Sequence, residues 1–134
     1  MRQEFLTKNV NETRKVAKLL AQEIKNGVVI GLVGELGAGK TTFIQAFAKG
    51  LGIKDKLTSP TFVLMKKYRN LYHIDCYRIS SYKDILALDF KEIISNPKNI
   101  VVIEWAEKIK KILPKNTIWL KFKVVSNNER KIII

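Results

Sequence analysis

The fold is decided by one stretch of the sequence, Val28-Val29-Ile30-Gly31-Leu32-Val33-Gly34-Glu35-Leu36-Gly37-Ala38-Gly39-Lys40-Thr41. Its first six residues form a continuous apolar run, which is typical of a strand covered on both faces within a parallel sheet. The next eight match the pattern G-x-x-x-x-G-K-[ST] at every fixed position. Apolar residues then recur at helical spacing, namely Phe43, Ile44, Phe47 and Leu51. A strand, a glycine-rich loop and a helix in this order predict a phosphate-binding loop.

The glycine-rich loop contains the residue types that phosphate binding requires. Glycines let the backbone wrap around a phosphate with its N–H groups turned inward, and the helix that follows directs the positive end of its dipole to the same point. We expect Lys40 to bridge the β- and γ-phosphates and the Thr41 hydroxyl to bind Mg²⁺. The sequence thus predicts a nucleoside triphosphate site, with binding residues Leu36, Gly37, Ala38, Gly39, Lys40, Thr41 and Thr42.

A second acidic residue is expected near this loop, at the end of a buried strand. The apolar run at residues 100–103 is followed directly by Glu104. Such a strand places its last carboxylate at the carboxyl edge of the sheet, where open α/β sheets bind ligands. Glu104 is therefore a candidate to hold magnesium through a water or to orient the attacking water. The alternative is a solvated glutamate at a strand end.

A polar cluster, His73-Ile74-Asp75-Cys76-Tyr77-Arg78, lies in a segment that the sequence predicts to be extended. In such a segment His73, Asp75 and Tyr77 share one face. Asp75 is a candidate for the metal shell and Arg78 for neutralising phosphate charge, but an ordinary ion pair between the two is an equal alternative. For His73, the sequence leaves a structural and a functional role open.

Two further places are candidates for nucleotide contacts. In Ser59-Pro60-Thr61-Phe62, the Thr61 hydroxyl is placed to sense the γ-phosphate as a switch threonine does, while a simple turn before a strand is the alternative. No segment specifies contacts to adenine. The turn at residues 9–12 and the side chain of Arg130 are candidate walls of a base pocket.

The remaining chain alternates strands and helices. Residues 4–7 are predicted as an edge strand, Asn9 with Glu12 as the capping box of a first helix, and Ser81 with Asp84 as the start of a third helix. Hairpins are predicted for residues 62–68 with 71–76 and for residues 117–125 with 130–134. This order predicts one domain over residues 1–134, with an α/β, P-loop NTPase-like three-layer sandwich around a mixed, partly parallel sheet with antiparallel edge hairpins.

Composition limits the classes of protein and of partner. The 134 residues are close to the usual size of one domain, and one cysteine, Cys76, excludes an internal disulfide. No apolar run approaches the length of a membrane span, so a cytoplasmic protein without a membrane partner is expected. Lys+Arg 25 against Asp+Glu 12 gives a net charge of +13, which favours acidic partners but equally fits a bias in codon usage.

The motifs together resemble the TsaE family (older name YjeE), small P-loop ATPases required for bacterial tRNA threonylcarbamoyladenosine biosynthesis. The likeness covers nearly the whole chain and rests on residues 34–43, Ser59-Pro60-Thr61-Phe62, His73-Ile74-Asp75-Cys76-Tyr77-Arg78 and Ile103-Glu104-Trp105. The phosphate loop is generic, and only its combination with the other three motifs is specific. The sequence departs from the family pattern at Asp89, where the family often has glycine.

The resemblance implies a function and a set of roles. Lys40 would hold phosphate, Thr41 and Glu104 would serve Mg²⁺, and Asp75 and Thr61 would support ATP turnover. It also implies that the protein binds a heterodimer of TsaB and TsaD, in which TsaD transfers threonylcarbamoyl to adenosine 37 of tRNA, and that it resets or activates this complex by hydrolysing ATP to ADP. Contact with tRNA would then be indirect, through the complex.

Other functions remain open from the residues. A small P-loop kinase acting on a small molecule is the main alternative, although such enzymes use a lid and several arginines to clamp two phosphorylated substrates. A GTPase is disfavoured because the chain contains no N-K-x-D sequence to read guanine. A nucleic-acid-binding module driven by the positive charge is a third alternative.

Overall fold

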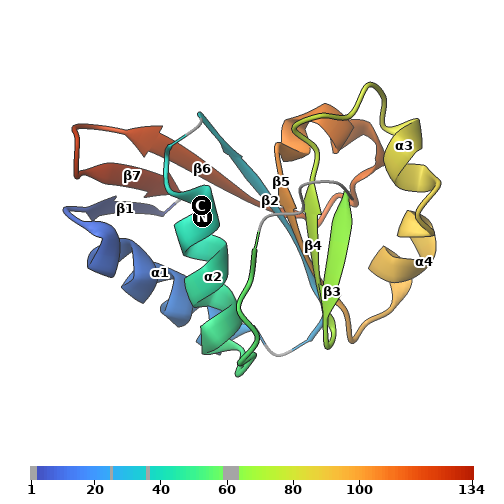
Figure 1. Ribbon diagram of the computed structural model, residues 1–134, viewed down its shortest axis with the longest axis horizontal. Coiled ribbons are helices and arrows are strands. Elements are labelled where there is room, and N and C mark those ends of the chain that lie inside the picture. The colour runs from blue at the N-terminus through green and yellow to red at the C-terminus, as the bar shows by residue number, and fades with distance from the viewer. Residues whose placement is uncertain (1–2, 25, 36, 59–63) are drawn as a thin grey trace.

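The computed structural model describes residues 3–24, 26–35, 37–58 and 64–134. These residues form one seven-stranded sheet in the order β1-β7-β6-β2-β5-β4-β3. The strands are β1 (Glu4–Thr7), β2 (Val28–Gly34), β3 (Met65–Tyr68), β4 (Leu71–Asp75), β5 (Ile100–Glu104), β6 (Ile118–Val124) and β7 (Arg130–Ile133). Figure 1 shows the sheet running through the middle of the molecule.

The four central strands β6, β2, β5 and β4 are parallel, and the edges are antiparallel. Strand β2 pairs with β5 and with β6, and β5 pairs with β4. The β3–β4 hairpin closes one edge, and β7 pairs with β6 and with β1 at the other. The mixed sheet with antiparallel edge hairpins is therefore confirmed. Because parallel strands end at the same edge, the carboxyl ends of β2, β4 and β5 lie side by side.

Helices cover both faces of the sheet, which makes the fold three-layered (Figure 1). One face packs against α1 (Val10–Glu23) and α2 (Lys40–Gly50). The other face packs against α3 (Lys83–Leu86), α4 (Phe90–Ser95) and the 3₁₀ helix η1 (Ala106–Ile112). Helix α1 begins as predicted, since the side chain of Asn9 accepts a hydrogen bond of 3.0 Å from the Glu12 N–H.

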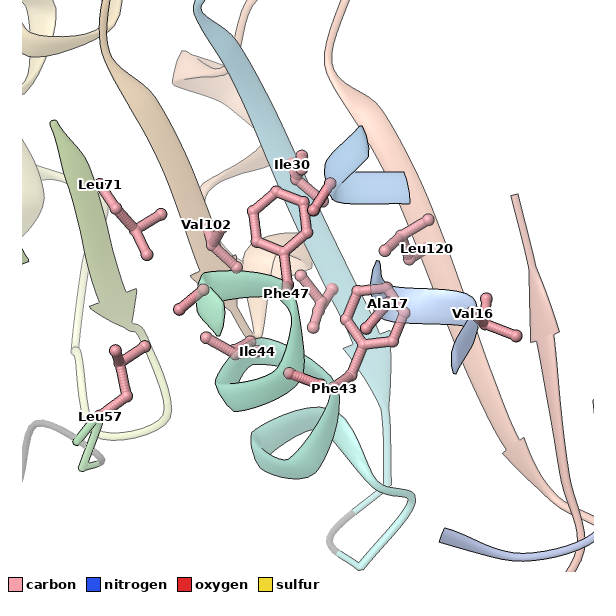
Figure 2. Packing of buried hydrophobic residues seen from close by; sticks show 14 of the residues in the cluster. Val16, Ala17, Ile30, Phe43, Ile44, Phe47, Leu57, Leu71, Val102 and Leu120 are labelled. Carbon is pink, nitrogen blue, oxygen red and sulfur yellow. The ribbon is translucent and has the colours of Figure 1, made fainter. Parts of the chain in front are cut away.

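The larger of the two cores holds α2 firmly against the sheet. Phe43, Ile44 and Phe47 project from α2 onto the sheet strands, as Figure 2 shows, and each is buried. The Phe43 ring meets the Phe122 ring edge-on, with the ring centroids 5.3 Å apart. Each such side chain contributes about 1.5–3 kcal/mol when fully buried. The rigid anchoring of α2 fixes the position of the glycine-rich loop that precedes it.

The helical segment between β4 and β5 differs from the sequence prediction. The sequence predicts a single helix that starts at Ser81 with Asp84, but α3 ends at Leu86 and a second short helix, α4, follows. Asp89 separates the two with a left-handed backbone of φ 58°. This conformation suits glycine, and aspartate adopts it more readily than most other residues. It accounts for the departure from the family pattern at this position.

Two other predictions are modified. The strand β3 starts at Met65, and residues 59–63, which include Thr61, lie outside the described residues. No helix was predicted after β5, yet η1 occupies residues 106–112. Ala106, Ile109 and Ile112 face the core, and the non-helical backbone of Ile109, with φ −121° and ψ 21°, puts a kink in the middle of this segment. Within the described part of the chain, no helix has the length and apolar character that crossing a membrane requires.

Candidate functional site

The glycine-rich loop leads from the end of β2 into the first turn of α2. Gly37 and Gly39 have left-handed backbones, with φ of 79° and 96°, which a side chain would disfavour. The Gly39 carbonyl accepts the N–H of Phe43 at 2.9 Å, so the helical hydrogen bonds start at the loop itself. The positive end of the α2 dipole therefore lies at the loop, as an anion site requires. Leu36 lies outside the described residues.

The side chain of Lys40 is folded back onto the loop. Its Nζ donates a hydrogen bond of 2.5 Å to the Gly34 carbonyl and lies 3.9 Å from the centre of the Trp105 ring. Burial lowers the pKa of the Lys40 ammonium, and the negative charges of Glu104, Glu107 and Asp75 partly oppose this effect. The ammonium thus occupies a partly desolvated place in which an incoming phosphate would strongly favour its charged form.

Two carboxylates stand opposite Lys40 at the carboxyl ends of β4 and β5. Asp75 and Glu104 are paired in register across these parallel strands, so their side chains leave the same face of the sheet. Burial raises the pKa of Asp75, a backbone hydrogen bond from Tyr77 opposes the shift, and the charge of Glu104 adds to it. Glu104 itself is 5% exposed, so the alternative of a solvated glutamate at a strand end is wrong.

The side chain of His73 contacts the Glu104 carboxylate. Its Nε2 lies 2.8 Å from Oε2 of Glu104, and its side chain is almost fully buried. Its Nδ1 is buried and has no hydrogen-bond partner within the described part of the chain. Asp75 Oδ1 accepts the backbone N–H of Tyr77 at 3.0 Å. Two members of the sequence cluster, His73 and Tyr77, therefore contact the two carboxylates.

The loop and the carboxylates line one pocket of about 340 Å³. Its walls are Gly37, Gly39, Lys40, Thr41, Thr42, Asp75, Tyr77, Glu104 and Trp105. Most of the described residues predicted to bind phosphate and magnesium are thus brought together, from segments up to sixty-odd positions apart. Ala38 does not line the pocket, because it is buried in the core beneath the loop, and His73 and Arg78 are not among its walls either.

A second pocket, of about 620 Å³, adjoins the first and shares Gly37, Gly39 and Thr42 with it. Asn9, Val10 and Asn11 line it from the start of α1, together with the guanidinium-bearing Arg130 of β7. Arg130 Nη2 donates to the Gly37 carbonyl at 3.1 Å and so ties β7 to the phosphate loop. Both candidate walls of a base pocket named from the sequence border this space.

Sequence reasoning missed several residues of the two pockets. Asn127 and Asn128, in the β6–β7 turn, line the larger one, and they had been interpreted only as turn residues. Trp105 has a left-handed backbone, with φ 56°, which costs roughly 1–2 kcal/mol for a residue with a side chain. This strained backbone sets the ring against Lys40. The signal for its role was its place directly after Glu104.

The smaller pocket offers oxygen donors suited to Mg²⁺, although the described ones are too few to bind the ion without other ligands. Among the described residues, no group of three or more His, Cys, Asp and Glu side chains is placed to hold a metal ion alone. Thr41 and Glu104 both line the smaller pocket and supply oxygen ligands. Mg²⁺ prefers one or two such protein ligands together with substrate phosphates and water. The donor set therefore fits a magnesium ion that arrives with a nucleotide.

Comparison with known proteins gives consistent matches. The family model for threonylcarbamoyl adenosine biosynthesis protein TsaE matches residues 7–132. The tRNA threonylcarbamoyladenosine biosynthesis protein TsaE of Bacillus subtilis is 40% identical over 133 residues, covering 96% of this chain and 82% of that protein. The protein of the same name from Treponema pallidum is 33% identical over 132 residues, covering 96% of this chain and 97% of its own. The crystal structure of YdiB from Bacillus subtilis superimposes with a TM-score of 0.80 at 36% identity, covering 99% of this chain and 84% of that one.

Proposed function

The chain belongs to the TsaE family, and from this membership we propose that it is a Mg²⁺-dependent ATPase that acts in tRNA threonylcarbamoyladenosine biosynthesis. The observation that carries the ATPase proposal is the meeting of the phosphate loop with Asp75 and Glu104 in a single pocket. Phosphoryl transfer in P-loop enzymes needs a backbone cradle, a lysine, a metal-binding hydroxyl and an acidic residue. A candidate for each of these four groups lines the same pocket of this protein.

Charge explains why the arrangement suits a triphosphate. Lys40 is held at a partly desolvated point beside the loop, so its ammonium gains a strong interaction when a phosphate enters. Binding of phosphate would break the contact between Nζ and the Gly34 carbonyl and draw the ammonium towards the β- and γ-phosphates. The backbone N–H groups at the start of α2 would hold the same phosphates without further charge.

The carboxylates are proposed to act on the metal and on the water. Thr41 and Glu104 would hold Mg²⁺, which when bound neutralises phosphate charge as it develops during transfer. Asp75, whose pKa is raised by burial, lies beside Glu104 and is suited to hold a proton or to align water near the γ-phosphate. The resemblance also gives Thr61 a supporting role in turnover, and that residue lies outside the described part of the chain.

The larger pocket is proposed to receive the adenosine. It joins the phosphate pocket through Gly37, Gly39 and Thr42, so a nucleotide can place its phosphates in one and its base in the other. Asparagine side chains offer both donors and acceptors for a base edge. The contact between Arg130 and the Gly37 carbonyl would couple the occupancy of the base pocket to the shape of the phosphate loop.

The partner is proposed to be the TsaB–TsaD heterodimer, and this step rests on family membership. ATP hydrolysis would reset or activate that complex between cycles of tRNA modification, with tRNA reached through the complex. The protein alone is expected to hydrolyse ATP slowly, because P-loop enzymes that receive a missing catalytic group in trans gain about 10³–10⁵-fold in rate.

The deciding experiment is steady-state ATP turnover measured with and without purified TsaB–TsaD at fixed magnesium and salt. Strong stimulation, with ATP preferred over GTP, is the expected result. A fast rate alone that the heterodimer leaves unchanged would contradict partner control, and turnover only with an added small phosphate acceptor would indicate a kinase. A salt titration of tRNA binding by the isolated protein separates direct contact from contact through the complex, because direct phosphate contacts give a steep log–log slope.

A further inference from the structure

The side chain of His73 is buried beside Glu104, and the proposed chemistry gives it no role. It lies on β4 on the same face as Asp75, and its partner in register on β5 is Val102, two residues before Glu104. The imidazole therefore sits beneath Glu104, on the side away from the pocket opening. The pocket walls do not include it. It touches the carboxylate but cannot reach a nucleotide directly.

The contact between His73 and Glu104 is a buried hydrogen bond. Nε2 of the ring and Oε2 of the carboxylate lie 2.8 Å apart, and both side chains are almost fully buried. With the carboxylate oxygen as the acceptor, Nε2 is the ring atom that donates. This donor fixes the orientation of the Glu104 carboxylate.

The orientation matters because the carboxylate proposed to serve Mg²⁺ also lies near a lysine. The Lys40 ammonium interacts electrostatically with Glu104. A carboxylate that turned freely towards this ammonium would neutralise the lysine that phosphate needs and would withdraw the ligand that Mg²⁺ needs. A hydrogen bond from His73 to Oε2 holds the carboxylate in place and leaves its other oxygen to serve a metal.

We propose that His73 is a positioning residue, which holds Glu104 through a hydrogen bond from Nε2 so that the carboxylate serves Mg²⁺ instead of closing onto Lys40. The inference rests on the proposed function, since it names the residue that prepares the magnesium ligand of that same site. It also assigns a role to the first residue of the His73-Ile74-Asp75 segment, which sequence reasoning left open.

The first test reads the hydrogen bond itself in the nucleotide-free protein. The sequence contains a single histidine, so ¹⁵N-labelled histidine gives one set of imidazole signals with no assignment problem. We expect a proton on Nε2 that is protected from exchange and whose shift is altered in Glu104→Gln. A ring without a proton on Nε2, or signals unchanged by Glu104→Gln, would overturn the proposal.

The second test reads the consequence for the metal. Mn²⁺ serves as the probe, and its affinity is measured by electron paramagnetic resonance in the presence of a non-hydrolysable ATP analogue. His73→Leu removes the donor, and His73→Gln keeps an N–H at a similar reach. We expect His73→Leu to weaken Mn²⁺ binding and kcat by about 10- to 100-fold, the usual effect of losing an outer partner of a metal ligand. Nucleotide affinity without metal should change little, and His73→Gln should recover much of the loss.

Leu71→Ala is the matched control for damage to the core. Leu71 lies on the same strand and face, two residues earlier, and belongs to the same buried core as Phe47 of α2 (Figure 2). Its aliphatic side chain makes no hydrogen bond to Glu104. It should lower the melting temperature but leave Mn²⁺ affinity intact. If His73→Leu does not fold, His73→Asn replaces it, because its shorter amide cannot reach Oε2. Equal loss in the control, or no recovery in His73→Gln, would overturn the positioning role.

Different results refute the proposed function and the role of His73. If the wild-type protein binds no Mn²⁺ with nucleotide, the proposed function fails and the positioning role with it, even where the NMR signature is present. If the wild-type protein hydrolyses ATP but the His73 variants keep normal Mn²⁺ affinity, the function stands and the inference alone is refuted.

Discussion

Replacing Lys40 with methionine should abolish turnover while leaving the fold almost unchanged. Methionine keeps a similar length and shape but carries no charge. It removes a hydrogen bond to the Gly34 carbonyl, which as a bond from a charged group contributes about 1.5–3 kcal/mol. It also removes the contact of 3.9 Å with the Trp105 ring, which contributes about 0.5–2 kcal/mol.

These losses are offset because the variant no longer holds an ammonium in a desolvated place. Burial is the largest influence on the pKa of Lys40 and lowers it, so the surroundings of the side chain disfavour its charged form. Replacing a buried charge with an apolar side chain of similar volume is often neutral for stability. We therefore expect the free energy of unfolding to change by no more than about 1 kcal/mol, which is an ordinary value for a point mutation.

The effect on catalysis should be far larger. The ammonium is needed once charge develops on the transferred phosphoryl group, and removing one such preorganised group lowers kcat by about 10²–10³-fold. Urea unfolding followed by circular dichroism gives the stability, and turnover of Mg²⁺–ATP gives the rate. Lys49→Met, at an exposed lysine of the same helix, is the matched control and should affect neither.

The same pair of proteins gives a pH test with a defined sign. Because the pKa of Lys40 is lowered from its ordinary 10.5 in the folded state, the unfolded chain binds more protons between the lowered value and 10.5. The stability of the wild type relative to Lys40→Met should therefore rise with pH across that window. A normal rate in Lys40→Met, a loss of several kcal/mol in stability, or the opposite trend with pH would refute this reasoning.

Other variants test the remaining groups. Glu104→Gln should retain the nucleotide complex but lose most of kcat, because the backbone cradle holds phosphate without it; loss of binding with unchanged turnover per bound nucleotide would exclude the metal role. Asp75→Asn should be more stable than the wild type at pH 7 but should turn over ATP more slowly. Burial raises the pKa of Asp75 above 3.8, so the ionised carboxylate destabilises the folded protein as the pH rises. The gain in stability, measured by urea unfolding, should vanish at low pH, and a variant less stable than the wild type at pH 7 would contradict this. Nucleotide binding should change the fluorescence of Trp105, because Lys40 leaves the face of its ring. The change should persist in Trp119→Phe and disappear in Trp105→Phe. The reverse pattern would show that Lys40 stays in place.

The sequence alone determined the elements whose signals are local. A continuous apolar run, a spaced set of glycines and the capping by Asn9 each depend on neighbouring residues, so β2, the phosphate loop and the start of α1 were predicted where the structure has them. Alternation of such elements was enough for the mixed sheet. Local signals also identified Lys40, Thr41, Asp75 and Glu104 as candidate site residues. They did not predict how these side chains are arranged around the pocket.

Only the tertiary structure decided the contacts that depend on strand order. The bond between His73 and Glu104 arises because β4 and β5 become parallel neighbours in one particular register, and Arg130 reaches Gly37 because the last hairpin folds back beside the loop. The sequence also did not predict the short helices α4 and η1. They are too short for local propensity to specify, and burial against the far face of the sheet stabilises them. Pairing between distant segments depends on the free energy of the whole packed chain, which no window of sequence contains.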